Sequence, residues 1–240
     1  MSKSKSLVQG SLFEDDYLIR SLGNIVKDPE YALTELVANA WDAGATKVDI
    51  IIPTAENGSI RVVDNGHGMM CEEFKTRWMK LGYNRAKHQG NIVEFPPGVD
   101  GGSRRAYGRS GIGRHGMFCF AEKYCVSTKK NGFQSTFCVE LSSGEHPFII
   151  TSEKIQSGGG FGTEIEAEVI RNLPHADSIR ETISARFIHD PRFSIFVNGT
   201  TLPLASHPGA EAPATLSVPG CGAIEVVLVD TQKSARTKQK

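Results

Sequence analysis

The sequence predicts an α+β fold, and three observations lead to this class. Segments with helical periodicity and helix-capping residues are interspersed with segments that alternate apolar and polar residues as strands do. Hydrophobic residues make up 39% of the chain, which is enough for a sizeable core. The length of 240 residues leaves room for one large domain or for one and a half small ones.

The first predicted elements are a helix and a pair of strands. The helix is expected over residues 29–43, because an Asp-Pro pair opens it and a glycine closes it. The segments "KVDIII" (47–52) and "SIRVVD" (59–64) are expected to be strands, and the Asn-Gly pair between them signals a turn.

A second helix and a long irregular segment follow. The helix is expected over residues 71–82, with Phe74, Trp78 and Leu81 on its buried side. Residues 83–110 show no convincing periodicity and are rich in proline, glycine and arginine. A loop of that length inside a compact domain is usually a lid, a binding loop or a disordered segment.

The rest of the chain is expected to complete the domain and to begin another unit. Residues 203–219 are rich in proline, alanine and glycine, as linkers are, and residues 223–231 are expected to form a strand. An isolated strand cannot bury itself, so we expect the chain to be the N-terminal part of a longer protein. The remaining predicted elements are a short helix at about 114–122, strands near 124–129, 134–141, 148–153 and 163–169, a helix over 175–189, and a strand with a turn over 193–202.

Charge and cysteine usage argue against several classes of protein. Lys+Arg and Asp+Glu both number 27, so net charge gives no support for a nucleic-acid or membrane surface. The N-terminus is polar, and no apolar run approaches the about 18 residues of a membrane span. The five cysteines form no CxxC pair, which favours a reduced compartment over a disulfide framework. We therefore expect a soluble cytoplasmic protein that does not bind membranes.

The segment "TELVANAWDAGAT" places three polar residues on one face of the first helix. Glu35, Asn39 and Asp42 fall within about 60° of arc, at roughly 100° per residue. A carboxylate at Glu35 is suited to deprotonate a water, and the amide oxygen of Asn39 is suited to Mg²⁺. The alternative is a solvated helix face opposite the apolar stripe, which is the commoner outcome for such a pattern.

The segment "VVDNGHGM" combines a strand end with recurring glycines. An ionised Asp64 only accepts hydrogen bonds, so it suits an amine donor such as the 6-amino group of adenine. Gly66 and Gly68 would let a flat ring lie against backbone, and Met69 would supply a soft apolar wall. The alternative is an ordinary β-turn.

The segment "GRSGIGRHGM" is a glycine-rich loop that enters a predicted helix. It contains the letters GxGxxG, but no strand precedes it, which argues against a dinucleotide-binding fold, and no Walker A motif is present. Free N–H groups at such a loop can bind phosphates, and Arg109 and Arg114 add positive charge. A flexible hinge is the alternative. Further on, Thr163 in "GGFGTEI" either follows a simple tight turn or donates a hydrogen bond to a base.

In their order, "ELVANAWDAGAT", "DNGHGM", "GRSGIGRHG" and "GTEI" resemble the four motifs of the GHKL (Bergerat-fold) ATPases. This superfamily includes gyrase-type topoisomerases, heat-shock chaperones, sensor histidine kinases, MutL mismatch-repair proteins and MORC chromatin ATPases. The resemblance spans about residues 31–169. It implies a two-layer α/β sandwich whose mixed sheet is covered on one face by helices, with an ATP lid between a helix and the glycine-rich loop.

The resemblance also implies ATP and Mg²⁺ as cofactors and gives a role to each motif residue. Glu35 resembles the general base, Asn39 the Mg²⁺ ligand, Asp42 a further acid near the adenine, and Asp64 the adenine-reading aspartate. The other nucleotide-binding positions implied are Gly66, Gly68, Met69, Gly108, Gly111, Ile112, Gly113, Arg114 and Thr163.

The lid is expected at about residues 83–110, and one lysine in it carries over from the family. The segment "LGYNRAK" resembles the MutL-like pattern LG-x-S/T-S-K, but Asn84, Arg85 and Ala86 stand where that pattern has other residues. Lys87 matches, so the resemblance implies that Lys87 binds nucleotide.

Within the superfamily, the motifs favour a MutL-like or MORC-like hydrolase. Sensor kinases generally lack a glutamate at the position of Glu35, so its presence favours hydrolysis. We expect an ATP-binding domain over 1–205, then a linker and the start of a truncated transducer domain over 206–240. In relatives that second domain supplies a lysine to the γ-phosphate, so this fragment is expected to turn ATP over slowly.

The predicted function is therefore that of a molecular clamp. ATP binding and hydrolysis are expected to drive lid closure and dimerisation of the chain, on a protein or DNA client that the sequence does not identify. One alternative is a nucleotide-sensing module with negligible hydrolysis. Another is a redox enzyme that binds NAD through "GIGRHG", which leaves the arrangement of Glu35, Asn39 and Asp64 unexplained.

Overall fold

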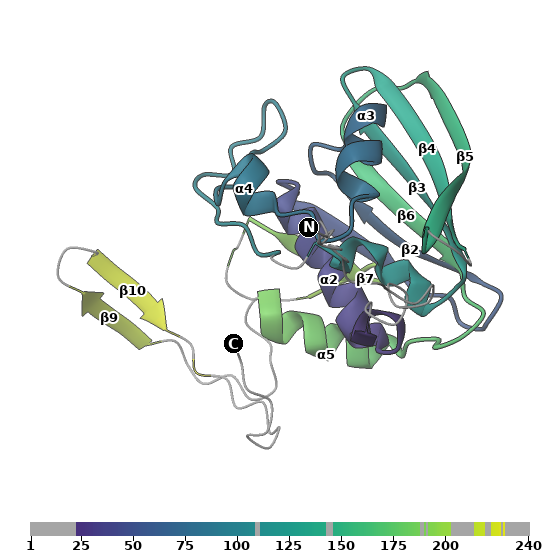
Figure 1. Cartoon of the computed structure of the whole chain (residues 1–240). Coiled ribbons are helices and arrows are strands. Elements are labelled where there is room, and N and C mark those ends of the chain that lie inside the picture. Colours follow the sequence, from purple (N-terminus) through teal and green to yellow (C-terminus); the bar gives the residue numbers. More distant parts are fainter. Residues whose placement is uncertain are drawn as a thin grey trace, which may run out of the picture.

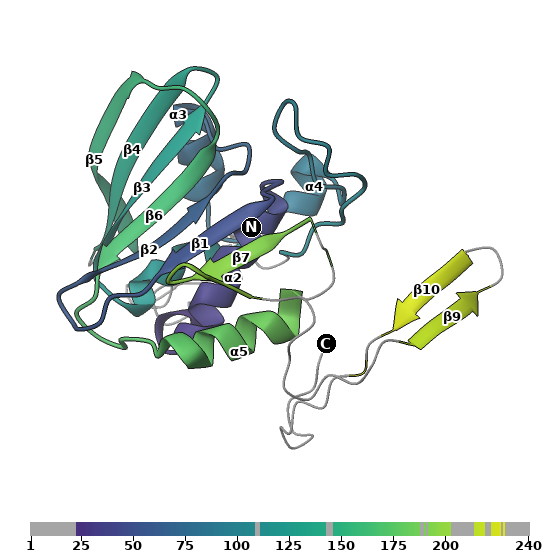
Figure 2. The same cartoon turned by 180° about the vertical axis from the view of Figure 1, so that it is seen from behind.

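The structure, a computed structural model, describes residues 23–108, 111–142, 146–187, 190, 192–202, 214–218, 222–226 and 228. In these residues an eight-stranded sheet carries helices on one face, and two further strands form a sheet of their own (Figure 1). Figure 2 shows the structure from behind, where strands β1 (Lys47–Ile51) and β7 (Ser194–Val197) pass in front of helix α2 (Pro29–Asp42), and helix α5 (Ala176–Phe187) lies below them.

The chain order of the elements alternates helices and hairpins. The helices are η1 (Gly23–Val26), α2 (Pro29–Asp42), α3 (Cys71–Glu73), η2 (Phe74–Trp78), α4 (Arg85–Gln89), η3 (Gly113–Cys119) and α5 (Ala176–Phe187). The strands are β1 (Lys47–Ile51), β2 (Ser59–Asp64), β3 (Lys123–Lys130), β4 (Phe133–Leu141), β5 (Phe148–Ser157), β6 (Gly162–Glu168), β7 (Ser194–Val197), β8 (Thr200–Thr201), β9 (Ala214–Val218) and β10 (Gly222–Val226).

The large sheet has the strand order β5-β4-β3-β6-β2-β1-β7-β8. Strands β1 and β7 pair in parallel, and the other neighbours pair in antiparallel fashion, so the sheet is mixed. With helices on one face, this arrangement confirms the predicted α+β class and the two-layer sandwich.

Helix α2 forms where the sequence predicts it and packs its apolar stripe on the sheet. The Asp28 carboxylate accepts the N–H groups of Glu30 and Tyr31 at 3.0 and 3.1 Å and so caps the helix. Alternate residues of β1 and β2 point toward the helix, as the period of two requires. The buried side chains of this layer include Leu33, Leu36, Val37, Ala40, Val48, Ile50, Ile60 and Val62.

The helix predicted over 71–82 is shorter and irregular. It consists of one turn of α-helix and the π-helix η2, which ends at Trp78, with the Met79 N–H donating to the Phe74 carbonyl at 3.2 Å. Tertiary packing accounts for the change in pitch, because Phe74 stacks on Phe137 of β4 at 4.0 Å between ring centroids. Trp78 Nε1 also donates to the hydroxyl of Tyr124 at 3.0 Å. Sequence periodicity cannot reveal a π-turn selected by such contacts.

Three further segments differ from their predicted form. The helix expected at 114–122 is the short 3-10 helix η3, and His115 interrupts it with non-helical φ and ψ. The segment 83–110 is not wholly irregular, because it contains α4 and a β-bridge between Ile92 and Arg105. Strand β5 runs on to Ser157, beyond the predicted end at residue 153.

The expected linker and final strand are also corrected. Part of 203–219 is strand β9, which pairs with β10, so the strand near residue 223 has a partner and is not isolated. Residues 203–213, and with them the expected domain boundary after residue 205, lie outside the described residues. That boundary stays a prediction.

The cysteine expectation is wrong for one pair. Cys125 and Cys138 stand directly opposite each other on β3 and β4 and form a disulfide, with Cα atoms 4.1 Å apart. The spacing of 13 residues conceals this proximity, which only the hairpin register creates. Among the described free cysteines, Cys119 is buried and Cys71 is partly buried.

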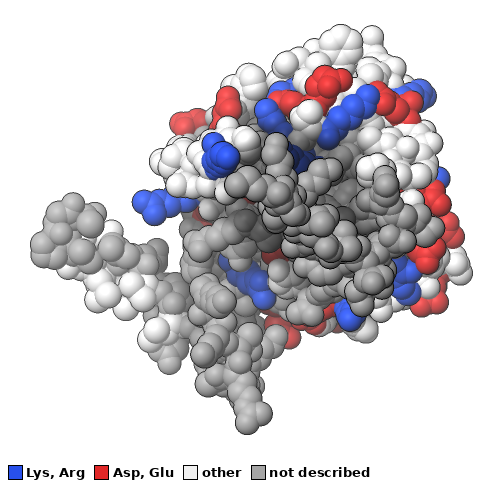
Figure 3. All heavy atoms as spheres, viewed as in Figure 1, with Lys and Arg blue, Asp and Glu red and all other residues white. Residues whose placement is uncertain are grey.

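The surface of the described residues agrees with the balanced charge. Figure 3 shows basic and acidic side chains intermixed over this face of the molecule. Within the described part of the chain, no helix is long and apolar enough to span a membrane.

Candidate functional site

One cavity brings together most residues that the four motifs predict. Helix α2, the ends of β2 and β6, the segment η2, the lid and the entry to η3 all contribute to its wall. The predicted residues that line it are Glu35, Asn39, Asp42, Asp64, Gly68, Met69, Gly108, Gly111, Gly113, Arg114 and Thr163. They are far apart in the sequence, so their convergence is a result of folding.

Three predicted residues do not line the cavity. Gly66 lies behind it and donates its N–H to Asp64 Oδ1 at 2.8 Å. Ile112 packs against the hydrophobic core. Lys87 is exposed and lies outside the lining residues, so the structure does not bring it together with the others.

The polar stripe of α2 faces the cavity because its apolar stripe faces the sheet. Asn39 Nδ2 is buried and has no hydrogen-bond partner among the described residues. Burial raises the pKa of Glu35, whereas a hydrogen bond from the Tyr31 hydroxyl and the charge of Arg186 lower it. A β-carbon added at Gly113 would lie 2.1 Å from Glu35 Oε2, so only glycine allows this close approach. The solvated-face alternative for this helix is therefore contradicted.

Asp64 lies at the end of β2, beside β6. Burial raises the pKa of Asp64 to about 6, and the N–H groups of Gly66 and Thr163 oppose this rise. Gly68 has φ of +62°, and an added β-carbon there would meet the Lys129 carbonyl at 2.1 Å. This turn is therefore built for glycine.

A buried threonine that the sequence did not single out supports this side of the cavity. Thr128 of β3 is fully buried and accepts the Met69 N–H at 2.8 Å. Its hydroxyl also lies 3.4 Å from that of Thr163. It fixes the backbone after the "DNGHGM" turn against β6, and only the pairing of β3 with β6 discloses that role.

The glycine-rich segment follows the lid and enters η3. The described residues before this segment form no strand that leads into it, which argues against the NAD alternative. Arg114 donates to the Arg77 carbonyl and lies 5.4 Å from the Tyr83 ring centroid, but its Nε has no partner in the described part of the chain. Arg109 and Ser110 lie outside the described residues.

Asp42, which the resemblance places near the adenine, contacts both ends of the lid. Its carboxylate accepts the N–H of Tyr107 at 2.6 Å and the N–H of Gly108 at 2.9 Å. Arg85 Nε lies 3.9 Å from the same carboxylate. Asp42 therefore ties both the beginning and the end of the lid to the C-terminal end of α2.

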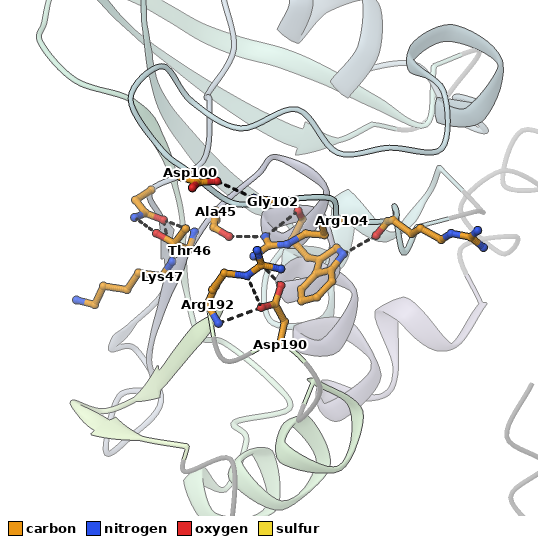
Figure 4. Close-up of polar contacts among 11 residues, drawn as sticks. Ala45, Thr46, Lys47, Asp100, Gly102, Arg104, Asp190 and Arg192 are labelled. Atoms are coloured by element: carbon orange, nitrogen blue, oxygen red, sulfur yellow. Dashed lines mark hydrogen bonds and ion pairs between the residues drawn. The ribbon is translucent and has the colours of Figure 1, made fainter. Parts of the chain in front are cut away.

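A buried arginine fixes the base of the lid (Figure 4). Arg104 is 2% exposed and donates to the Ala45 carbonyl at 2.5 Å. Its guanidinium lies 3.3 Å from Asp190 Oδ2 and 4.2 Å from the ring centroid of Trp41. Phe95 and Phe193 also lie around it, at 4.7 and 5.3 Å. The lid segment next to Gly108 is thus anchored to α2 and, through Asp190, to the segment between α5 and β7.

Other lining residues escaped prediction. The cavity wall also contains His67, Arg77, Trp78, Tyr83, Arg85 and Gln89. Of these, Trp78 had been assigned to a buried helix face. The spacing of four between Arg85 and Gln89 would have placed them on one face of α4, had the helix been recognised.

Comparison with known proteins identifies the family. The family described as "Histidine kinase-, DNA gyrase B-, and HSP90-like ATPase" matches residues 27–157, more than half of the chain. The chain belongs to this family. Membership in this ATPase family supports ATP binding, and it suggests ATPase activity in general.

The individual proteins to which the chain is similar are longer than the chain. A putative type II restriction enzyme HgiDII of Herpetosiphon aurantiacus is 28% identical over 182 residues, covering 70% of this chain and 28% of its own length. DNA mismatch repair protein MutL of Xylella fastidiosa is 51% identical over 52 residues, covering 22% of this chain and 8% of its own length. DNA mismatch repair protein MutL of Listeria monocytogenes is 33% identical over 70 residues, covering 29% of this chain and 12% of its own length. The chain thus spans less than a third of each relative.

The described residues fit a magnesium ion only in part. They contain no group of three His, Cys, Asp or Glu side chains that could hold a metal. Asn39 offers one amide oxygen, and Mg²⁺ commonly completes its octahedron with waters and phosphate oxygens. The donor set is consistent with a metal that arrives with the nucleotide rather than one resident in the protein.

Proposed function

We propose that the chain binds Mg²⁺-ATP in this cavity and hydrolyses it. The observation that carries the proposal is the convergence of Glu35 and Asn39 with Asp64, Thr163 and the glycine-rich segment around one cavity. These groups would provide a general base, a metal ligand, a group that recognises adenine and backbone donors for phosphates.

The roles follow from the chemistry of each group. Asp64 would accept a hydrogen bond from the 6-amino group of adenine, and the N–H groups near Gly111 and Gly113 would donate hydrogen bonds to phosphate oxygens. Magnesium held by Asn39 would neutralise charge on the phosphates. Glu35 would orient a water toward the γ-phosphate and take its proton, and its burial favours this role because burial raises its pKa.

We further propose that ATP closes the lid and brings two copies of the chain together. Support comes from the lid itself, whose two ends both meet Asp42 at the cavity wall. The names of the relatives favour a DNA-processing client for the full protein. A cytoplasmic location also remains a proposal, and the disulfide between Cys125 and Cys138 counts against it.

The decisive experiment replaces the proposed base. Glu35→Ala should abolish release of inorganic phosphate while ATP binding changes by less than about threefold, because a general base acts in the chemical step. Phosphate release and ATP affinity are measured on the same preparation. Hydrolysis at the wild-type rate by this variant would show that Glu35 is not the base.

A second candidate is a nucleotide-sensing module that does not hydrolyse ATP. It is favoured by one observation: among the described residues that line the cavity, none is a lysine, whereas the family is expected to use one at the γ-phosphate. Tight ATP binding by the wild-type chain with no phosphate release over hours would select this second function.

A further inference from the structure

One face of the lid helix α4 borders the cavity. Arg85 and Gln89 are four residues apart, so they lie on the same side of the helix, and both line the cavity. Lys87 points away from that side and is exposed. His88 stacks on Tyr83 with 5.0 Å between ring centroids. The cation that α4 presents to the cavity is therefore Arg85.

The Arg85 side chain is held between the lid and α2. Its Nη1 donates to the Gly90 carbonyl at 2.8 Å, and its Nη2 donates to the Asp42 carbonyl at 3.3 Å. The side chain is 13% exposed. These bonds hold the guanidinium at the cavity wall in the absence of a ligand, so little rotamer entropy would be lost on binding.

The position of Arg85 indicates which part of a nucleotide it would meet. Asp42 Oδ2 lies 3.9 Å from Arg85 Nε and accepts the Gly108 N–H at 2.9 Å. Arg85 Nε and the Gly108 N–H therefore both face the same Asp42 oxygen. Gly108 begins the glycine-rich segment that is proposed to bind phosphates. The charge of Arg114 also acts on Asp42. Arg85 thus lies beside the segment proposed to bind phosphates, and this assignment moves Asp42 from the adenine, where the resemblance places it, to the phosphate side of the cavity.

The chemistry of the side chain fits a phosphate. A guanidinium has five N–H donors, and the hydrogen bonds to Gly90, Asp42 and Ile92 use three of them. One Nη1 N–H is not used by these bonds, so the guanidinium can donate one charge-assisted hydrogen bond to a phosphate oxygen.

We propose that Arg85 is the lid residue that binds the phosphate chain of the nucleotide, in place of Lys87. The inference rests on the proposed ATP binding. The Arg104 anchor supports it, because the Val93 N–H donates to the Arg104 carbonyl at 2.8 Å and so ties the lid segment that follows α4 to the anchored base.

The test compares single-charge variants of the lid. Arg85→Gln removes the proposed contact, Lys87→Gln removes the family position, and Arg105→Gln removes an exposed lid charge elsewhere as a matched control. The affinities for ATP with Mg²⁺ and for adenosine are measured by competition against a fluorescent ATP analogue. Arg85→Gln should weaken ATP binding by about tenfold or more, because a charge-assisted hydrogen bond is lost, and change adenosine binding by less than about threefold. Lys87→Gln and Arg105→Gln should each change ATP binding by less than about twofold.

Each contrary result has a distinct meaning. Equal losses for ATP and adenosine in Arg85→Gln would show that Arg85 only shapes the lid, and a larger loss of ATP affinity in Lys87→Gln would restore the family position. Either result overturns the inference about Arg85 without contradicting the proposal that the wild-type chain binds ATP. A wild-type chain that binds no ATP would instead overturn the proposed function.

Discussion

Asp64 combines two opposing requirements at the scale of a single residue. Adenine recognition needs an ionised carboxylate, whereas burial favours the neutral form and raises the pKa to about 6. Between pH 3.8 and 6 the folded state therefore binds more protons at Asp64 than the unfolded state does. The neutral side chain is the more stable one in the fold, so stability contributed by Asp64 is full at low pH and lost as pH rises through 6.

Asp64→Asn should therefore separate stability from binding. At pH 7.5 the variant should be more stable than the wild type, by on the order of 2 kcal/mol, because it no longer buries a charge. The gain should vanish near pH 4, where the wild-type carboxyl is protonated. ATP affinity at pH 7.5 should fall in the same variant. Urea unfolding at both pH values measures the first effect, and a fluorescent nucleotide the second.

His115 makes folding stability depend on pH in the opposite direction to Asp64. It is fully buried, and burial lowers its pKa to about 3. The unfolded state takes up a proton below about pH 6.5 and the folded state does not, so the stability that His115 contributes is lost as pH falls.

An Asp64→Asn variant that is less stable than the wild type at pH 7.5, and stays so at pH 4, would contradict burial as the cause of the raised Asp64 pKa.

At the scale of elements, the lid is a short helix and a bridged pair of segments on a fixed base. The Ile92–Arg105 bridge brings the two arms together, and Trp41 Nε1 donates to the Arg105 carbonyl at 2.8 Å. Arg104 then inserts between α2 and Asp190. The base of the lid should resist opening even when its tip moves, because a buried charge would lose its partners.

Arg104→Met should destabilise the domain by about 3 kcal/mol or more, because Asp190 then loses a buried partner and the Ala45 carbonyl loses a donor. Arg105→Met, at the neighbouring exposed position, should stay within about 0.5 kcal/mol of the wild type. Both values come from denaturant unfolding. Similar midpoints for the two variants would show that the lid base is not an anchor.

At the scale of the whole molecule, the proposed clamp requires two copies and a nucleotide. The Glu35→Ala variant with Mg²⁺-ATP should elute as a dimer, because the ATP-bound state cannot decay by hydrolysis. The wild type with ADP should elute as a monomer. Size-exclusion chromatography with light scattering measures both masses. The same mass with ATP, with ADP and without nucleotide would remove dimerisation from the proposed function.

Sequence reasoning located the elements whose signals are local. It predicted the capped helix and the pair of strands after it, and it predicted that Glu35, Asn39 and Asp64 lie at one site. Periodicity and strand ends indicate which way these side chains face without tertiary information. Which side chains line the cavity also depends on how the short helix α4 is turned. Arg85 lines the cavity and Lys87 does not, and the binding role of Lys87 stays a prediction.

The sequence by itself determined the fold class, the ATPase family and the polar stripe of the first helix, because these depend on residue order and spacing. Tertiary structure alone decided the disulfide between β3 and β4, the π-turn under Trp78 and the buried site of Arg104. It also decided that Asp42 holds the lid. Each of these depends on which atoms meet across the sheet or the cavity, and register and packing, rather than local sequence, set those meetings.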